Sequence, residues 1–373
     1  MNICFISRVF YLGGVSTHLI DLSKELIKSG HKVTIMTAGP AYPQKKENIQ
    51  LFEEYLNLGV NYIHIDFPLN SINKFKYLSG LFFSSFKAIN ILKNEKFDII
   101  HVHTPILSFI PKLAGLKFVR TVHANLANMS IFDIKADKEI AISTELYDFT
   151  KKKYKYNEDD IFLIKNGVSY EKLKDINESQ VVELRKNLNL NKEVVISLVG
   201  GINFNKGHDI LIKSIIKLEP YLKSRLKIIF LGEGSDQYIS EVKELINQSD
   251  LTDRFIFLPF QNPKNIYHIS DIVVLPSRNE GYGLVIVEAM LMGCCAIRSK
   301  SGGAYDQIQN GVTGLLFEAE NIDQLADSLT LVLKDDLLRK KIATSGQRTA
   351  LDDFTSEKMT LKTLDVYKQI LDI

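Results

Sequence analysis

The stretch with the clearest chemistry is PSRNEGYGLVIVEAMLMG, residues 276–293, in which Glu280 and Glu288 stand eight residues apart. Just before it, the run DIVVLP is nearly all apolar and β-branched, as is typical of a strand buried on both faces. Glu280 lies in the loop that follows, and Glu288 lies in an apolar run of helical length. The first amides of a helix have no partner within the helix, so this helix start predicts a phosphate site.

The two glutamates need partners that a phosphate site does not supply. A carboxylate repels a phosphate, so carboxylates on either side of such a site favour uncharged ligands, of which sugar hydroxyls are the obvious candidates. Glu280 and Glu288 together therefore suggest a sugar and a ribose joined by a diphosphate. Two plainer interpretations remain: Glu280 could simply complement the helix dipole, and Glu288 could lie at the solvent boundary of its helix.

The elements that would position these residues alternate between short apolar runs and helical periodicity. In the first half, expected strands cover residues 3–7, 32–37, 60–65, 98–103, 118–123 and 138–143. Between the first two, leucines recur at helical spacing, with Ser16 or Thr17 as the expected cap and Gly30 as the stop. This alternation predicts right-handed βαβ units and a parallel sheet.

A second series of the same kind follows. Its expected strands cover residues 194–200, 226–232, 254–260, 271–276 and 294–299. At 373 residues the chain exceeds what one core usually supports. We therefore expect an α/β protein with two domains, residues 1–166 and 167–354. In open parallel sheets ligands bind at the carboxyl ends of the strands, where the loop of Glu280 lies.

Composition limits the class of protein further. The chain is 45% hydrophobic and 24% charged, which indicates a globular protein. Its three cysteines, Cys4, Cys294 and Cys295, do not form a disulfide framework, so a cytoplasmic location is expected. The N-terminus carries Arg8 within its apolar stretch and is interpreted as a first strand, not a signal peptide. No apolar run approaches the roughly 18 residues of a membrane span.

The charge is unevenly divided. Against a net charge of +2, residues 1–166 carry 21 Lys and Arg and 16 Asp and Glu, a balance of +5. This favours an anionic partner such as a lipid pyrophosphate, an anionic glycan or a bilayer surface, although ordinary lysine-rich solvation explains it equally well. Nothing in the pattern points to nucleic acid.

Residues 71–97 have two interpretations. Phe75, Tyr77, Phe82, Phe83 and Phe86 alternate there with lysines. Such a basic amphipathic helix could lie on an anionic membrane. Alternatively, it packs on the sheet of the first domain and its lysine side chains extend to water.

The histidines allow a similar choice. His101 and His103 alternate on one expected strand and share a face, but the sequence offers no third ligand for a metal. His123 ends another expected strand and is either a functional group or a hydrogen-bonded core histidine.

Several motifs in a fixed order resemble the retaining glycosyltransferases of family 4. They are GGVSTHLIDLSKEL at 13–26, DIIHVH at 98–103, TVH at 121–123, NGV at 166–168, NKGHDILIKSI at 205–215, E-x7-E at 280–288, the pair Gly302 and Gly303, and NGVTG at 310–314. The resemblance covers most of the chain. It implies the GT-B fold, in which two Rossmann-like domains face each other across a cleft and a final helix, here residues 355–373, packs back on the first domain.

The resemblance also implies roles for single residues. Glu280, His123 and Lys206 would be catalytic: Glu280 would meet the hydroxyls of the transferred sugar, His123 its primary hydroxyl, and Lys206 the leaving diphosphate. The implied donor-binding residues are Gly14, Gly201, Lys206, Gly281, Tyr282, Gly283, Leu284, Val285 and Glu288. The sequence contains no D-x-D, which fits an enzyme that requires neither metal nor cofactor.

Two positions depart from the family, and one of them is Asp306, where the family commonly has glutamate after the paired glycines. At the other, the pattern usually has an arginine five residues before the lysine, and this chain has Gly201 there. Losing a charge-assisted contact would weaken diphosphate binding by about 1.5 to 3 kcal/mol. Arg278, Lys165 or Arg8 could compensate.

The expected function is transfer of a sugar from a nucleoside diphosphate, UDP in the first place, to the hydroxyl of a glycan or lipid-linked glycan, in bacterial surface polysaccharide or glycoconjugate synthesis. Contact with the cytoplasmic face of the inner membrane would fit a lipid-linked acceptor. The alternatives are a GT-B nucleotide-sugar 2-epimerase and a non-catalytic nucleotide-sugar-binding subunit, the latter suggested by Gly201.

Overall fold

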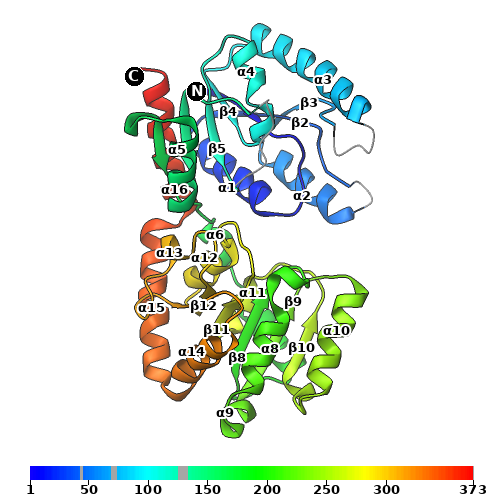
Figure 1. The fold of residues 1–373 in the computed structure, drawn as a ribbon, viewed down its shortest axis with the longest axis vertical. Helices are drawn as coiled ribbons and strands as arrows, with labels where there is room; N and C mark the ends of the chain where they lie inside the picture. Colours follow the sequence, from blue (N-terminus) through cyan, green and yellow to red (C-terminus); the bar gives the residue numbers. More distant parts are fainter. Residues whose placement is uncertain (43–44, 69–73, 125–132, 373) are drawn as a thin grey trace. The chain divides into compact units, whose positions relative to one another are not determined.

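The computed structural model describes residues 1–42, 45–68, 74–124 and 133–372. The chain forms two compact units. Unit 1 comprises Met1–Gly167 together with Ser356–Ile373, and unit 2 comprises Val168–Thr355 (Figure 1). These boundaries lie one residue from the 166/167 and 354/355 divisions expected from the sequence.

Unit 1 is built on a seven-stranded parallel sheet in the order β3-β2-β1-β4-β5-β6-β7. Its strands are β1 Asn2–Ile6, β2 Lys32–Thr37, β3 Asn61–His64, β4 Ile99–Val102, β5 Val119–Val122, β6 Lys138–Ala141 and β7 Ile161–Leu163. Its helices are α1 Gly14–Lys28, α2 Lys46–Asn57, α3 Lys74–Asn94, α4 Phe109–Leu113, α5 Thr144–Tyr154 and α16 Ser356–Ile370. In register, Ile3 of β1 lies beside Val33 of β2 and Ile99 of β4.

Both faces of this sheet are covered by helices. Because side chains alternate along each strand, neighbouring residues of one strand enter different cores. Ile3 and Phe5 point to a core shared with α1, α2 and α16, whereas Cys4 and Ile6 point to a second core shared with α3 and α4. The C-terminal helix α16 thus belongs to unit 1 and packs beside α1.

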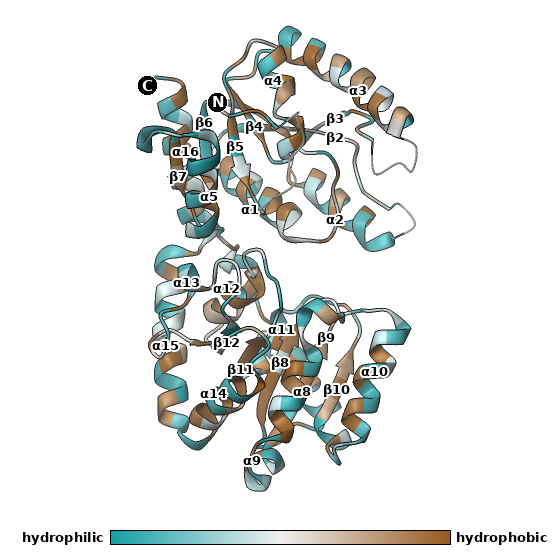
Figure 2. Ribbon diagram, in the orientation of Figure 1, coloured by the Kyte–Doolittle hydropathy of each residue, from teal (hydrophilic) through white to brown (hydrophobic). Residues whose placement is uncertain are grey.

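Unit 2 repeats the pattern with a six-stranded parallel sheet in the order β10-β9-β8-β11-β12-β13. The strands are β8 Val194–Val199, β9 Leu226–Leu231, β10 Phe255–Leu258, β11 Ile272–Leu275, β12 Cys295–Ser299 and β13 Leu315–Phe317. The helices are α6 Tyr170–Lys174, α7 Glu178–Asn187, α8 His208–Ile216, α9 Pro220–Ser224, α10 Asp236–Asn247, α11 Lys264–Ile269, α12 Leu284–Leu291, α13 Ala304–Gln307, α14 Ile322–Lys334 and α15 Asp336–Asp353. Figure 2 shows the apolar strands at the centre of this unit and the polar sides of its helices outside.

Three local details differ from the sequence-based expectation. The strands β7 and β13 were not predicted, because each has only three residues. Helix α1 begins at Gly14 with Gly13 as its N-cap, so the prediction of a Ser16 or Thr17 cap is wrong. Ser16 lies inside the helix instead, and its hydroxyl accepts a hydrogen bond from the Tyr11 amide at 3.2 Å. Among the described residues, no helix is both long and apolar enough to cross a membrane.

Candidate active site

The candidate site of unit 2 lies where strands β8, β11 and β12 end. Because β8, β11 and β12 are parallel neighbours, their carboxyl ends meet at one edge of the sheet (Figure 1). The chain leaves β8 for β9 on one side, while β11 lies on the other side. This reversal of strand order opens a crevice that commonly binds ligands in parallel α/β sheets. The loops that carry Lys206, Glu280 and Gly302 follow these three strands.

Lys206 and Glu280 form an ion pair at this edge. The Lys206 ammonium donates to Glu280 Oε2 at 2.6 Å, and the Ser277 hydroxyl donates to the same oxygen at 3.0 Å. The Gly281 amide donates to Oε1 at 3.2 Å. Both side chains are partly accessible, with 24% of Lys206 and 13% of Glu280 exposed, so a ligand can reach the pair. The structure thus brings together two of the residues that the sequence predicts to be catalytic.

The loops around this pair pack backbone against backbone. Gly207, which follows Lys206, has φ 71°, and a Cβ there would lie 2.1 Å from the Pro276 carbonyl oxygen. Gly302 has φ 56°, and a Cβ there would lie 2.2 Å from the Glu280 carbonyl oxygen. Only glycine allows such approaches. Lys206 and Glu280 are therefore positioned by direct contact between the loops that follow β8, β11 and β12.

Arg298 of β12 holds the Gly281-Tyr282-Gly283 turn in place by a hydrogen bond to its backbone. Its guanidinium is fully buried and donates to the Tyr282 carbonyl at 2.9 Å, to the Ser301 carbonyl at 2.6 Å and to the side-chain oxygen of Gln307. Burial lowers the pKa of Arg298 to about 10, while the charge of Glu280 acts in the opposite direction. Arg298 is therefore charged at neutral pH, and these three acceptors are all neutral oxygens.

Helix α12 starts directly after this turn. Gly283 is its N-cap, in the left-handed region, and no acidic residue occupies the first turn. The amides of Leu284 and Val285 have no partner within the helix, so they can donate to an anion. The ring of Tyr282 is buried, so contact of Tyr282 with a ligand would run through its main chain.

Glu288 lies one turn further along α12. Its Oε2 accepts a hydrogen bond of 2.5 Å from the hydroxyl of Tyr267, a buried residue of α11. Burial, followed by the nearby charge of Glu288, raises the pKa of Tyr267 well above its ordinary value. Tyr267 therefore stays protonated and orients the Glu288 carboxylate.

The structure bears on how the missing arginine at Gly201 could be replaced. Arg278 binds Asp209 through two hydrogen bonds of 3.0 and 2.9 Å, and its guanidinium lies 3.6 Å from the centre of the Phe204 ring. Burial would raise the pKa of Asp209, but the bonds from Arg278 hold it below its ordinary value. Arg278 is thus already paired. Lys165 and Arg8, the other suggested replacements, belong to unit 1.

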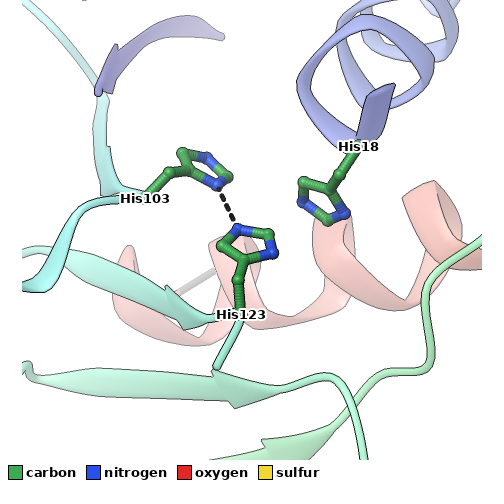
Figure 3. Close-up of side chains that lie close together, drawn as sticks. All are labelled: His18, His103 and His123. Atoms are coloured by element: carbon green, nitrogen blue, oxygen red, sulfur yellow. Dashed lines mark hydrogen bonds between the residues drawn. The ribbon is translucent and has the colours of Figure 1, made fainter. Parts of the chain in front are cut away.

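His123, the third residue predicted to be catalytic, lies in unit 1 within a cluster of three histidines (Figure 3). His103 follows β4, His123 follows β5, and His18 comes from α1, one turn after Gly14. His103 Nδ1 and His123 Nε2 are hydrogen-bonded at 3.3 Å, and the His18 ring lies 4.8 Å from that of His123. Gly14, predicted to bind the donor, and His123, predicted to be catalytic, therefore lie in one region of unit 1.

The hydrogen bonds of His18 fix its tautomer. Its Nδ1 lies 2.9 Å from the side-chain oxygen of Asn166, which can only accept, so Nδ1 carries the proton. Nε2, which has no hydrogen-bond partner in the described part of the chain, then presents its lone pair toward the other two rings. Burial lowers the pKa of His18 to about 4, and it lowers the pKa values of His103 and His123 well below normal, so all three are neutral at pH 7.

Of the described residues, only these three histidines come together as metal ligands could, each offering a ring nitrogen within 4.8 Å of the others. The sequence-based statement that His103 has no third ligand in view missed this grouping. His101 has separate partners, since its ring nitrogens bond Tyr367 and Thr121, each at 2.7 Å.

Sequence reasoning also missed two residues of the unit 2 site. Arg298 lies in the largely apolar strand β12, and an arginine in such a strand is itself a signal. Its buried guanidinium needs acceptors, which here are carbonyl oxygens of the neighbouring loops. Tyr267 donates a hydrogen bond to Glu288, but the two residues lie in different helices, so no spacing rule connects them.

Comparison with solved structures defines the class of protein. The glycosyltransferase from Rickettsia africae superposes with a TM-score of 0.82 at 26% identity, covering 99% of this chain and 98% of the other. Anabaena HepE, solved in complex with UDP, gives a TM-score of 0.82 at 20% identity, with 99% and 100% covered. Two Rossmann-like units of this kind are the GT-B fold of glycosyltransferases, as the sequence predicted.

Family models and relatives then identify the family. The model described as "Glycosyltransferase Family 4" matches residues 12–172, and the model described as "Glycosyl transferases group 1" matches residues 181–349. N-acetyl-alpha-D-glucosaminyl L-malate synthase of Bacillus anthracis is 25% identical over 381 residues, covering 96% of this chain and 95% of that protein. An uncharacterized glycosyltransferase of Methanocaldococcus jannaschii is also 25% identical, over 383 residues, with 96% and 94% covered. The chain belongs to glycosyltransferase family 4 and is a glycosyltransferase.

Proposed function

We propose that this enzyme transfers a sugar from a nucleoside diphosphate to an acceptor hydroxyl with retention of anomeric configuration. The observation that carries the proposal is the Lys206–Glu280 ion pair, which lies before the first turn of α12. It combines a cation for a diphosphate with a carboxylate for sugar hydroxyls. UDP is the preferred nucleotide, since structures of HepE with UDP and with UDP-glucose share this fold.

Each residue has a distinct role in the proposed reaction. Lys206 and the amides of Leu284 and Val285 stabilise the charge that develops on the departing diphosphate. Glu280 accepts hydrogen bonds from hydroxyls of the transferred sugar. Glu288, oriented by Tyr267, accepts hydrogen bonds from the ribose.

Proton transfer needs no further protein base in this proposal. As the bond between the sugar and the diphosphate breaks, negative charge collects on the leaving oxygen. That oxygen takes the proton of the acceptor hydroxyl on the same face of the sugar, and the acceptor oxygen bonds to the anomeric carbon. His123 is neutral and can hydrogen-bond a primary hydroxyl of the sugar. Neither a metal nor a cofactor takes part.

The proposed setting is the bacterial cytoplasm, where the enzyme would contribute to surface polysaccharide or glycoconjugate synthesis. The acceptor would be a glycan or a lipid-linked glycan, and a lipid-linked acceptor would place the enzyme at the cytoplasmic face of the inner membrane. Nucleic acid has no part in this function.

The test is a panel of nucleotide sugars, first by thermal shift and then by product analysis. Stabilisation by one donor, followed by slow release of UDP and free sugar without acceptor, supports transfer. The anomeric coupling constant of a product formed with added acceptor reports retention. Epimerised nucleotide sugar would instead identify a 2-epimerase, and tight binding without turnover would identify a non-catalytic binding subunit. Either result would overturn the proposal.

A further inference from the structure

Helix α3 is apolar on two opposite faces. One face packs into unit 1, where Leu81, Ala88 and Leu92 are almost completely buried in the core beside β1 and β4. This packing agrees with the second interpretation of residues 71–97, a helix packed on the sheet of the first domain, and residues 71–73 lie outside the described part of the chain. A helix that only covers a sheet needs no second apolar face, because its outer residues meet water.

The outer face of α3 nevertheless carries large apolar side chains. The exposed fractions are 81% for Phe75, 50% for Leu78, 67% for Phe82, 71% for Phe83 and 60% for Phe86. Phe75, Leu78, Phe82 and Phe86 are spaced by three, four and four residues, so they form one stripe along three turns. Phe83 widens this stripe, and its ring meets that of Phe82 edge to face at 5.7 Å. We call these five residues the α3 aromatic stripe.

Singly exposed apolar residues are ordinary on protein surfaces, but a contiguous group marks a contact. Four phenylalanines in twelve residues of one helix, residues 75–86, are such a group. The five residues share one face, whereas other exposed apolar residues, such as Leu337 and Leu361, belong to separate helices.

The charge next to the stripe indicates the chemistry of the partner. Helix α3 contains lysines and neither aspartate nor glutamate. Lys76, Lys87 and Lys93 are all exposed. Lys76 and Lys87 are eleven residues apart, which is about three turns, so they lie on the same side of the stripe. Lys93 follows Phe86 by seven residues, about two turns, and therefore lies in line with it. An exposed apolar stripe next to exposed lysines, on a helix without acidic residues, complements a surface with acyl chains below and negative charge above, which an anionic bilayer provides.

We propose that the α3 aromatic stripe docks unit 1 on an anionic lipid bilayer. The phenylalanines enter the boundary between headgroups and acyl chains, while Lys76, Lys87 and Lys93 remain at the level of the lipid phosphates. The helix lies in the plane of the interface, with its other face still packed on the sheet. This contact depends only on unit 1, so it stands or falls separately from the proposed sugar transfer.

The experiment is co-sedimentation of the full chain with vesicles of phosphatidylcholine alone and of equal parts phosphatidylcholine and phosphatidylglycerol. The wild-type chain should sediment with the anionic vesicles, and added salt should weaken binding. The double variant Phe82→Ser, Phe86→Ser should lose binding at every salt concentration. The double variant Lys76→Glu, Lys87→Glu should bind roughly tenfold more weakly or worse at low salt, because each basic residue near such a surface strengthens binding.

Matched controls separate the stripe from general changes of surface. Leu337→Ser removes an apolar side chain that is as exposed as Phe75 but lies in unit 2, and Lys341→Glu reverses an exposed charge there. Both should bind vesicles like the wild type. Circular dichroism and UDP-induced stabilisation report folding of the stripe variants. If the serine variant loses both the circular dichroism signal and the stabilisation by UDP, the double variant Phe82→Tyr, Phe86→Tyr takes its place. This tyrosine variant should bind vesicles more weakly than the wild type but still measurably.

Three results would overturn the proposal. One is equal sedimentation of the serine pair and the Leu337→Ser control. Another is equal binding to neutral and anionic vesicles. The third is a lipid-free dimer in sedimentation velocity that dissociates in the serine pair, which would assign the stripe to a second copy of the chain.

Discussion

The ammonium of Lys206 lies 2.6 Å from Oε2 of Glu280, so two side chains 74 positions apart in the sequence act as one unit. In this arrangement the carboxylate already holds the cation that a diphosphate would attract. When a donor binds, Lys206 therefore shares its hydrogen bonds between Glu280 and the phosphate. For this reason a substitution of Glu280 and a substitution of Lys206 should change donor affinity in opposite directions.

Glu280→Gln should lower turnover much more than it lowers donor affinity. The amide cannot balance charge on the reacting sugar, yet it releases Lys206 for the diphosphate, so UDP binding should hold or tighten. Steady-state kinetics and calorimetry with UDP measure the two effects. A large loss of UDP affinity with unchanged kcat would contradict this assignment.

Lys206→Ala should act in the other direction. It removes a charge-assisted contact and leaves the Glu280 carboxylate unpaired beside the phosphate, so UDP binding should weaken by about 1.5 to 3 kcal/mol. Lys213→Ala is the matched control, since Lys213 pairs with Asp209 on α8 at 3.3 Å and should leave UDP binding unchanged. Equal effects of both substitutions would remove Lys206 from the site.

Glu288→Ala should weaken nucleotide binding by about 1.5 to 3 kcal/mol, because the ribose hydroxyls lose a charged acceptor. Tyr267→Phe keeps the carboxylate but removes the bond that orients it, so its effect should have the same sign and be about 1 kcal/mol. Both variants are tested by calorimetry with UDP and with ribose 5-phosphate, which lacks the uracil base. Glu241→Ala on α10 serves as the control. UDP affinity that is unchanged in Glu288→Ala would contradict ribose binding.

Gly201→Arg should tighten donor binding by up to about 3 kcal/mol, since it restores a guanidinium near the proposed diphosphate. A Cβ there would lie 3.6 Å from the Glu233 carbonyl oxygen and 3.3 Å from the Asn203 amide nitrogen, so the Asn203 side chain must shift by a few tenths of an ångström to admit the new residue. Gly201→Glu, of similar bulk, should weaken binding. Weaker binding in the arginine variant would mean that another cation already occupies this space, and no change in either variant would move the diphosphate away from this loop.

The histidine cluster predicts how stability depends on pH. The pKa of His18 is about 4 in the folded chain and about 6.5 when unfolded, so between these values the unfolded chain binds more protons. Stability is therefore fully present above pH 6.5 and falls as pH decreases toward 4, by on the order of 3 kcal/mol for His18. Denaturation midpoints from pH 7.5 to 4.5 should show this fall, and His18→Gln should make it shallower. An unchanged slope in His18→Gln would mean that His18 does not titrate in this range.

Much of the fold follows from the sequence because β-branched runs between helical segments specify parallel strands directly. All eleven predicted strands exist, within one or two residues at their ends. The two missed strands, β7 and β13, are too short to show a pattern and form because a neighbouring strand supplies their hydrogen bonds.

The site could be predicted only where chemistry is local. Glu280, Glu288 and the α12 start share one stretch of sequence, and the motif around Lys206 marks a second. The contacts of Arg298 with Tyr282, of Tyr267 with Glu288, and of His18 with His123 each join different elements. They are set by tertiary packing, for which sequence periodicity carries no signal.

Arg298 has a consequence for the entropy of binding. Its neutral acceptors include the Tyr282 and Ser301 carbonyls, on both of the loops that meet at Gly302. These loops are therefore ordered when the chain folds rather than when a ligand arrives. A ligand of this site therefore binds without the entropic cost of ordering these loops. Its association rate should be close to that of ligands of rigid pockets, and any slow conformational step would have to arise elsewhere in the chain.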